Sequence, residues 1–152
     1  MATPKEQLNL IRLIHFALMG GAGVFAVLVA FLVVSDNISG TPIEVLNYLS
    51  PAYFFIILAS HSVVFKSIIR NTDLAGKDIK QKLASYQTAH IIRLAILEGC
   101  ALFASVVALL NGEILHLITV ALTMAIMYSK LPTPFLVESE LRLNPDEKDQ
   151  LQ

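Results

Sequence analysis

Glu98 is an acidic residue within an otherwise apolar stretch of sequence, and its position makes it the first candidate for chemistry. It lies in the apolar segment 91–110, about 10 Å from the start of that segment if the segment is helical. An ionised carboxylate at that depth in a bilayer is costly and usually faces protein with a polar partner. A carboxyl group placed there can carry a proton or bind a cation, so Glu98 is the leading candidate for a proton or ion site.

Several basic side chains lie near the charged ends of the same apolar segments. The candidates are Arg12, His15, His61, His90 and Arg93, whereas His116 falls near the opposite ends. Arg93 and Glu98 are five residues apart, about 140° around a helix, so a partner for Glu98 must come from another helix. Two interpretations stay open. In the first, these side chains form a cluster that relays protons, because the surroundings can tune the pKa values of a carboxyl group and of histidines. Alternatively, Glu98 bonds to His61 or Arg12 and fixes helix register while the other Arg and His side chains anchor helix ends.

Other kinds of chemistry have no support in the sequence. No helix pattern carries the His-x-x-x-His or Glu-x-x-His spacing of a metal site. No nucleophile elbow, phosphate-binding loop or zinc-protease motif occurs. Cys100 is the single cysteine; it has no partner for an intramolecular disulfide and is expected to be a core thiol. We therefore expect no enzyme activity, no metal and no cofactor.

The composition indicates that the surroundings of these residues are lipid. Of 152 residues, 55% are hydrophobic and only 15% are charged, and the mean hydropathy is +0.67. Those values are typical of an integral membrane protein and not of a soluble domain of this size. The formal net charge of -1 lacks the basic excess of a nucleic-acid-binding protein. Membrane lipids are therefore expected partners, and nucleic acid is not.

Four apolar segments are long enough to be considered as membrane spans, at about 9–34, 45–67, 84–110 and 114–130. Each should be an α-helix, because lipid offers no hydrogen-bond partner to an open backbone. Only three residues separate the last two segments, so these should form an antiparallel hairpin. A cleaved signal peptide is the alternative for the first segment, but its apolar run is longer than a typical signal core. The prediction is an all-α polytopic membrane protein, with an antiparallel four-helix domain at 1–131 and a short cytoplasmic helical tail at 132–152.

The distribution of Lys and Arg predicts the orientation. All eleven lie near the same ends of the four spans or in the segments beyond those ends, which places every one on one side. On the opposite side the only charged residues are acidic, namely Asp36, Glu44 and Glu113. Because cytoplasmic loops are enriched in Lys and Arg, both termini are predicted to be cytoplasmic. Any soluble partner should then bind from the cytoplasm.

The cytoplasmic segments carry helical patterns of their own. Ile79, Leu83, Tyr86 and His90 recur at spacings of four, three and four, which predicts a helix running directly into the third span. The sequence 144–147 has the pattern of a capping box with proline at the first helical position, and Thr133 with Pro134 suggests a second helix start. These helices are interpreted either as a docking surface for a partner or lipid head groups, or as a solvated extension.

Small residues mark the first and third spans for close packing. They are Gly20, Gly21 and Gly23 in the first span and Ala95 and Gly99 in the third. Small side chains let helix backbones approach closely in membranes. The pattern predicts packing of these two spans against each other, and it would equally serve a homo-oligomer.

The run Ile92–Leu110, with Glu98 among small residues and a Val-Val-Ala-Leu-like ending, resembles the carboxylate-bearing helix of rotary ATP synthase subunit c. That resemblance implies that Glu98 corresponds to the ion-binding acid. The whole chain is similar to small four-helix inner-membrane proteins of bacteria, which implies a multi-pass location in the bacterial inner (plasma) membrane and no activity. The sequence therefore predicts one of two functions: a scaffold or accessory subunit of a membrane complex, or a proton or ion translocator that uses Glu98 in an oligomer.

Overall fold

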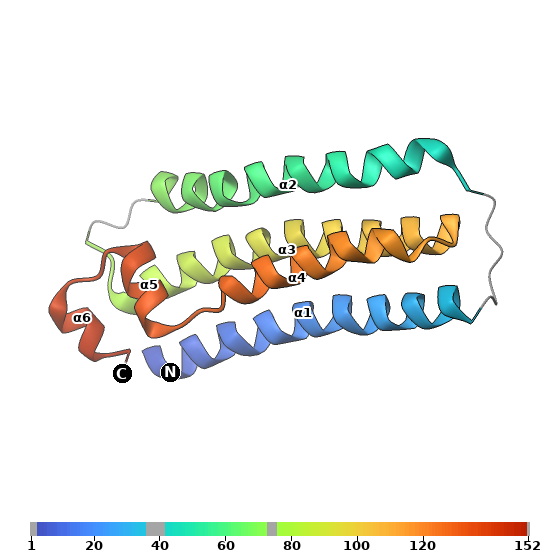
Figure 1. Ribbon diagram of the computed structural model, residues 1–152. Coiled ribbons are helices and arrows are strands. Elements are labelled where there is room, and N and C mark those ends of the chain that lie inside the picture. Colours follow the sequence, from blue (N-terminus) through green and yellow to red (C-terminus); the bar gives the residue numbers. More distant parts are fainter. Residues whose placement is uncertain (1–2, 36–41, 73–75, 152) are drawn as a thin grey trace.

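The structure is a computed structural model that describes residues 3–35, 42–72 and 76–151, and every regular element in these ranges is helical (Figure 1). The predicted charge at Asp36 lies outside the described residues. The elements are α1 (Pro4–Val34), α2 (Glu44–Asn71), α3 (Ile79–Asn111), the 3-10 turn η1 (Ile114–His116), α4 (Leu117–Ser129), α5 (Pro134–Leu141) and α6 (Pro145–Asp149). The all-α expectation is confirmed for the part of the chain that is described.

Three of these helices are long and apolar enough to cross a membrane, namely α1, α2 and α3. The fourth predicted span is less regular. The segment Ile114–Ser129 meets the same requirement only together with α5, and the two are bent by 79° relative to each other. Prolines at positions 132 and 134 explain the break, because the residue before a proline is disfavoured in helical conformation. The described residues therefore contain three continuous candidate spans, and a fourth only if the bent pair is counted as one broken span.

The long helices lie side by side, and α3 is the central one (Figure 1). Its most extensive contact is with α1 and the next with α2, which confirms the expected packing of the first and third spans. The N-terminus lies at the same end of the molecule as α5 and α6. Side chains from all the long helices and the tail can therefore meet at this end, which we call the tail end.

Helix α3 is continuous over 33 residues, as the helical spacing before the third span predicts. Asp78 caps its N-terminus, and the Asp78 side chain accepts a hydrogen bond from the Gln81 backbone N–H. Gly112 caps its C-terminus with a φ of 67°. This left-handed conformation suits glycine and lets the chain turn back directly into η1 and α4.

The tail is folded onto the bundle. Its predicted helix starts are confirmed, since Thr133 and Asn144 both cap helices and Asn144 forms a complete capping box with Glu147. The tail side chains Val137, Leu141 and Leu151 are buried in one cluster with residues of α1, α2 and α3. The interpretation of a solvated extension is therefore wrong, because the apolar face of 79–90 is covered by the chain's own C-terminal segment.

Alanines take part in the buried contact between α1 and α3, whereas the expected glycines are not among its buried residues. Ala22 packs with Ala101 and Ala104 in one cluster. A Cβ at Gly20 or Gly99 would meet no described atom within 4 Å outside its own helical neighbourhood. The other positions differ: Ala95 is exposed, and a Cβ at Gly21 would meet only the Glu98 side chain of α3. A Cβ at Gly23 would stand 3.3 Å from the Met124 side chain, so at Gly23 the close approach is to α4. A role for these glycines in an oligomer stays a prediction.

Candidate functional site

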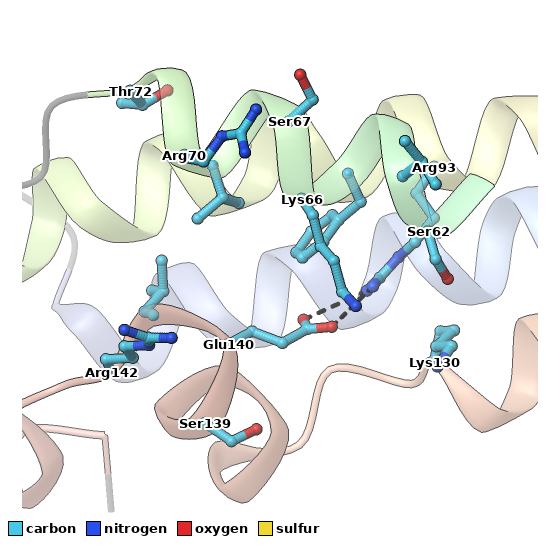
Figure 2. Close-up of a pocket in the computed structure, with 14 residues that line it drawn as sticks. Ser62, Lys66, Ser67, Arg70, Thr72, Arg93, Lys130, Ser139, Glu140 and Arg142 are labelled. Atoms are coloured by element: carbon cyan, nitrogen blue, oxygen red, sulfur yellow. Dashed lines mark hydrogen bonds and ion pairs between the residues drawn. The ribbon is translucent and has the colours of Figure 1, made fainter. Parts of the chain in front are cut away.

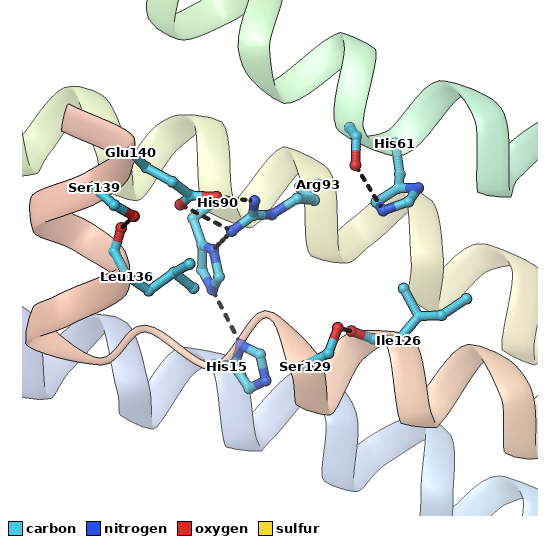
Figure 3. A network of polar contacts seen from close by, with 10 residues as sticks. His15, His61, His90, Arg93, Ile126, Ser129, Leu136, Ser139 and Glu140 are labelled. Carbon is cyan, nitrogen blue, oxygen red and sulfur yellow. Dashed lines mark hydrogen bonds and ion pairs between the residues drawn. The ribbon is translucent and has the colours of Figure 1, made fainter. Parts of the chain in front are cut away.

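A chain of polar side chains connects the tail to the bundle interior at the tail end (Figure 3). Arg93 of α3 donates from Nη1 to Glu140 Oε1 of α5 at 2.8 Å. Its Nη2 donates to His90 Nδ1 at 2.8 Å, and His90 Nε2 lies 3.1 Å from His15 Nδ1 of α1. Four side chains thus link α5, α3 and α1, and we call them the polar chain.

The hydrogen bonds of the polar chain have a defined direction. A guanidinium group only donates, so His90 Nδ1 must accept and the neutral ring carries its proton on Nε2. That N–H donates to His15 Nδ1, which places the proton of a neutral His15 on its own Nε2. The Nε2 atom of His15 is buried and has no hydrogen-bond partner among the described residues. The chain therefore runs from the charged pair to a buried, unused N–H donor.

Aromatic rings surround the charge of Arg93, whose side chain is only 2% exposed. The guanidinium carbon lies 3.9 Å from the centre of the Phe65 ring of α2. His90 stacks between Tyr86 and His15, with ring centres 5.5 and 5.3 Å away. A buried cation is tolerated only when it is paired, and here the Glu140 carboxylate and the face of the Phe65 ring provide that pairing.

Two of the other predicted residues lie outside the polar chain. Arg12 donates from Nε to the Pro132 carbonyl oxygen at 2.8 Å and so joins α1 to the segment between α4 and α5. His61 is satisfied within its own helix: its Nδ1 lies 3.1 Å from the Ile57 carbonyl oxygen, and the Ser62 hydroxyl lies 3.0 Å from its Nε2. The structure therefore brings His15 and Arg93 together with His90, and it leaves Arg12 and His61 to separate contacts.

Glu98 is also separate from the polar chain. Its side chain is half-buried on α3, with Oε1 3.9 Å from the position that a Cβ at Gly21 would occupy. Within the described part of the chain, Glu98 makes no hydrogen bond and no ion pair. The pairing with His61 or Arg12 that the sequence suggested does not form, because both of those side chains bond elsewhere.

Glu140 is the member of the polar chain that the sequence did not indicate. It is 47 residues from Arg93 in the chain, and nothing in the local sequence indicates where α5 folds. A partial signal was nevertheless present. Val137 and Leu141 are apolar residues four positions apart, which marks one side of the helix as its buried side, and Glu140, three residues after Val137, lies near that side.

A second group of polar side chains, which the sequence also did not indicate, forms hydrogen bonds between helices at the opposite end of the bundle. Asn47 Oδ1 accepts hydrogen bonds from Asn111 Nδ2 at 2.6 Å and from His116 Nε2 at 3.0 Å. Asn111 Oδ1 accepts from the Ile43 backbone N–H at 3.0 Å. These bonds join α2, α3 and η1, and they confirm that His116 lies away from the tail-end residues.

In the polar chain, the charge of Arg93 is paired within the protein, by Glu140. No group of three or more His, Cys, Asp or Glu side chains within residues 3–35, 42–72 and 76–151 is placed to hold a metal ion. The polar chain joins three helices through one charged pair and two neutral histidines. Comparison with protein families, curated proteins and solved structures finds no match to this chain.

Proposed function

We propose that this protein is a scaffold or accessory subunit of a complex in the bacterial inner membrane. In this proposal its helices form an antiparallel four-helix bundle with both termini in the cytoplasm. The position of the N-terminus and the tail at one end supports this topology (Figure 1). The confinement of all Lys and Arg residues to one predicted side also supports it.

The observation that carries the scaffold proposal is that polar side chains at both ends of the bundle pair with one another across helices. At the tail end, Arg93 is held by Glu140 and His90, and at the other end Asn47 holds Asn111 and His116. Pairing of this kind uses hydrogen-bonding capacity to hold helices together, and it supports a rigid structural element. The lipid-facing surfaces of α1 and α2, with exposed side chains such as Val27 and Phe55, are then the contact surfaces for other membrane subunits.

The scaffold proposal is tested by isolating the tagged chain from its native membranes at its natural level. We expect a particle of defined mass in mild detergent, with the chain at constant stoichiometry in native mass spectrometry. Val27→Ala with Phe55→Ala removes exposed side chains from the proposed contact surfaces and should release the chain from that particle, whereas Glu138→Ala in the tail should not. Recovery of the wild-type chain only as a monomer would overturn the proposal.

A second function is favoured by one specific observation, the unpaired carboxylate of Glu98. Its neighbour Gly21 is exposed on the surface of α1, so a second copy can approach the carboxylate there. In this alternative, an oligomer moves protons or ions through Glu98. Proteoliposomes carrying a proton-sensitive dye distinguish the two functions. Proton uptake by wild type that Glu98→Gln abolishes, with its fold intact, would favour the translocator, because an amide cannot exchange that proton.

A further inference from the structure

A cavity of about 1030 Å³ opens at the tail end between α2, α3 and α5 (Figure 2). We call it the basic pocket, because its wall carries five cationic side chains and one carboxylate. They are Lys66 and Arg70 of α2, Arg93 of α3, Lys130 after α4, Arg142 after α5, and Glu140 of α5. Figure 2 shows the side chains of α2 on one side of the pocket and those of Glu140 and Arg142 on the other.

The charges of the basic pocket are not balanced within the described chain. Glu140 is already paired with Arg93 at 2.8 Å. The other four cations make no ion pair with any described carboxylate. Four like charges around one cavity repel one another unless an anion lies between them. The Ser67 hydroxyl group also lines the wall and can donate a hydrogen bond, whereas the hydroxyl groups of Ser62 and Ser139 already bond to His61 and to the Leu136 carbonyl oxygen. Several cations and a hydroxyl donor around one cavity suit an anion with several oxygen atoms, such as a phosphate group.

The backbone at Arg142 is a second, independent observation. Arg142 has a φ of 50°, the left-handed conformation, and it is the only non-glycine residue with a positive φ in the described ranges. Glycine or asparagine is the usual choice where a helix ends in this way. An arginine there is unfavourable for the backbone, and such residues cluster at ligand sites. Its guanidinium group lines the basic pocket.

The basic pocket lies beside the apolar surface of the membrane-spanning helices. Val63 of α2 is 65% exposed, and the first cation, Lys66, follows it within one helical turn. This order along α2 places the pocket where an apolar bilayer core gives way to lipid head groups. Lipid phosphates lie at that level, and basic pockets between spanning helices on the cytoplasmic side bind anionic head groups.

We propose that the basic pocket binds the phosphate group of an anionic phospholipid. Lys66, Arg70, Lys130 and Arg142 contact the phosphate oxygens, and Arg93 with Glu140 forms the neutral inner wall. The acyl chains of the lipid then lie along α2 beside Val63. The position of the pocket at the level of the lipid head groups rests on the membrane location proposed above, and its assignment to the cytoplasmic leaflet rests on the proposed orientation.

The test uses the full chain, purified in detergent and freed of lipid, with phosphatidylglycerol, phosphatidylcholine and inorganic phosphate as the probes. Native mass spectrometry measures bound lipid, and thermal melting measures stabilisation. We expect phosphatidylglycerol to bind at least about tenfold more tightly than phosphatidylcholine, whose choline group offsets the phosphate charge. Lys66→Gln with Arg70→Gln should weaken phosphatidylglycerol binding about 10- to 30-fold, because each basic residue near an anionic membrane surface strengthens binding about fivefold.

Two further variants keep the test decisive. Lys77→Gln with Lys80→Gln removes two cations from the same end of the molecule but away from the pocket wall, and it should leave lipid binding unchanged. Arg142→Gly removes a pocket cation while suiting the left-handed backbone, so it should fold normally and bind phosphatidylglycerol less tightly. The proposal is overturned by an equal loss in the Lys77 and Lys80 control, by equal binding of the two lipids, or by unchanged binding in Arg142→Gly. Displacement of the lipid by millimolar inorganic phosphate, with equal thermal stabilisation, would instead assign the pocket to free phosphate.

Discussion

Arg93 of α3 and Glu140 of α5 are 47 residues apart in the sequence and form a 2.8 Å ion pair at the tail end of the bundle. The arginine is 2% exposed and the glutamate 19%. Through this pair the tail is bound to the central helix, and through His90 the same arginine is bound to α1. The pair is therefore one of the contacts, together with the buried apolar cluster and the Lys82–Glu147 pair, through which the C-terminal segment and the long helices stabilise one another.

Loss of Glu140 should be strongly destabilising. Glu140→Ala leaves the buried Arg93 cation without its carboxylate, and breaking a buried pair from one side typically costs about 3–5 kcal/mol. The variant should melt at a lower temperature in detergent and release α5 and α6 to limited proteolysis. Glu138→Ala is the matched control, because Glu138 faces Lys148 at a longer 3.8 Å. Equal melting temperatures for the two variants would show that the Arg93 pair contributes little.

Added bulk should be tolerated at Gly20 and not at Ala22. Ala22 is 1% exposed and packs against Ala101 and Ala104, so Ala22→Leu overfills the contact between α1 and α3 and should cost about 1–3 kcal/mol. A side chain at Gly20 would meet no described atom within 4 Å outside its own helical neighbourhood, so Gly20→Leu should melt like wild type. The melting temperatures of the monomeric Ala22→Leu and Gly20→Leu variants, compared with that of wild type, test this prediction. If Gly20→Leu dissociates an oligomer without lowering the monomer's stability, that face of α1 contacts a second copy.

Attachment of α6 should weaken in acid. A hydrogen bond from Lys82 lowers the pKa of Glu147, and the two atoms are 2.6 Å apart. Because the folded pKa lies below the unfolded value of about 4.3, the pair stabilises the fold above that value and loses its contribution as the pH falls further. Protection of the tail from an acid-stable protease should therefore fall below about pH 4. Glu147→Gln keeps the capping hydrogen bonds but not the charge, so it should lose this pH dependence, whereas Asp146→Asn should retain it.

The proposed orientation predicts which residues a membrane-impermeant thiol reagent reaches. In a chain with Cys100 replaced by alanine, a cysteine at Glu113 should react from outside intact cells. A cysteine at Ser139, in α5, should react only after the membrane is opened. The physical reason is the confinement of all Lys and Arg residues to the tail side. Labelling in the reverse pattern would contradict the proposed topology.

Local sequence determined most of the helices. Apolar runs long enough to cross a bilayer predicted α1, α2 and α3, because in lipid the backbone must satisfy its own hydrogen bonds. The spacing of Ile79, Leu83 and Tyr86 predicted the extension of α3, and the pattern at 144–147 predicted α6 with its capping box. These features depend on neighbours within one or two turns, so they can be read without knowledge of the fold.

Tertiary structure decided which polar groups meet. The sequence singled out Glu98, His15, His61 and Arg93 as polar groups near apolar segments, but it could not pair them, because pairing depends on helix rotation and on contacts between distant segments. The carboxylate that Arg93 binds is Glu140, brought to it by the folding of α5 onto the bundle. Glu98, the most conspicuous acid in the sequence, faces Gly21 and makes no polar bond within the described chain. The distance of a residue from the end of its apolar segment could be counted from the sequence. The direction in which each side chain points depends on how the other helices pack around it.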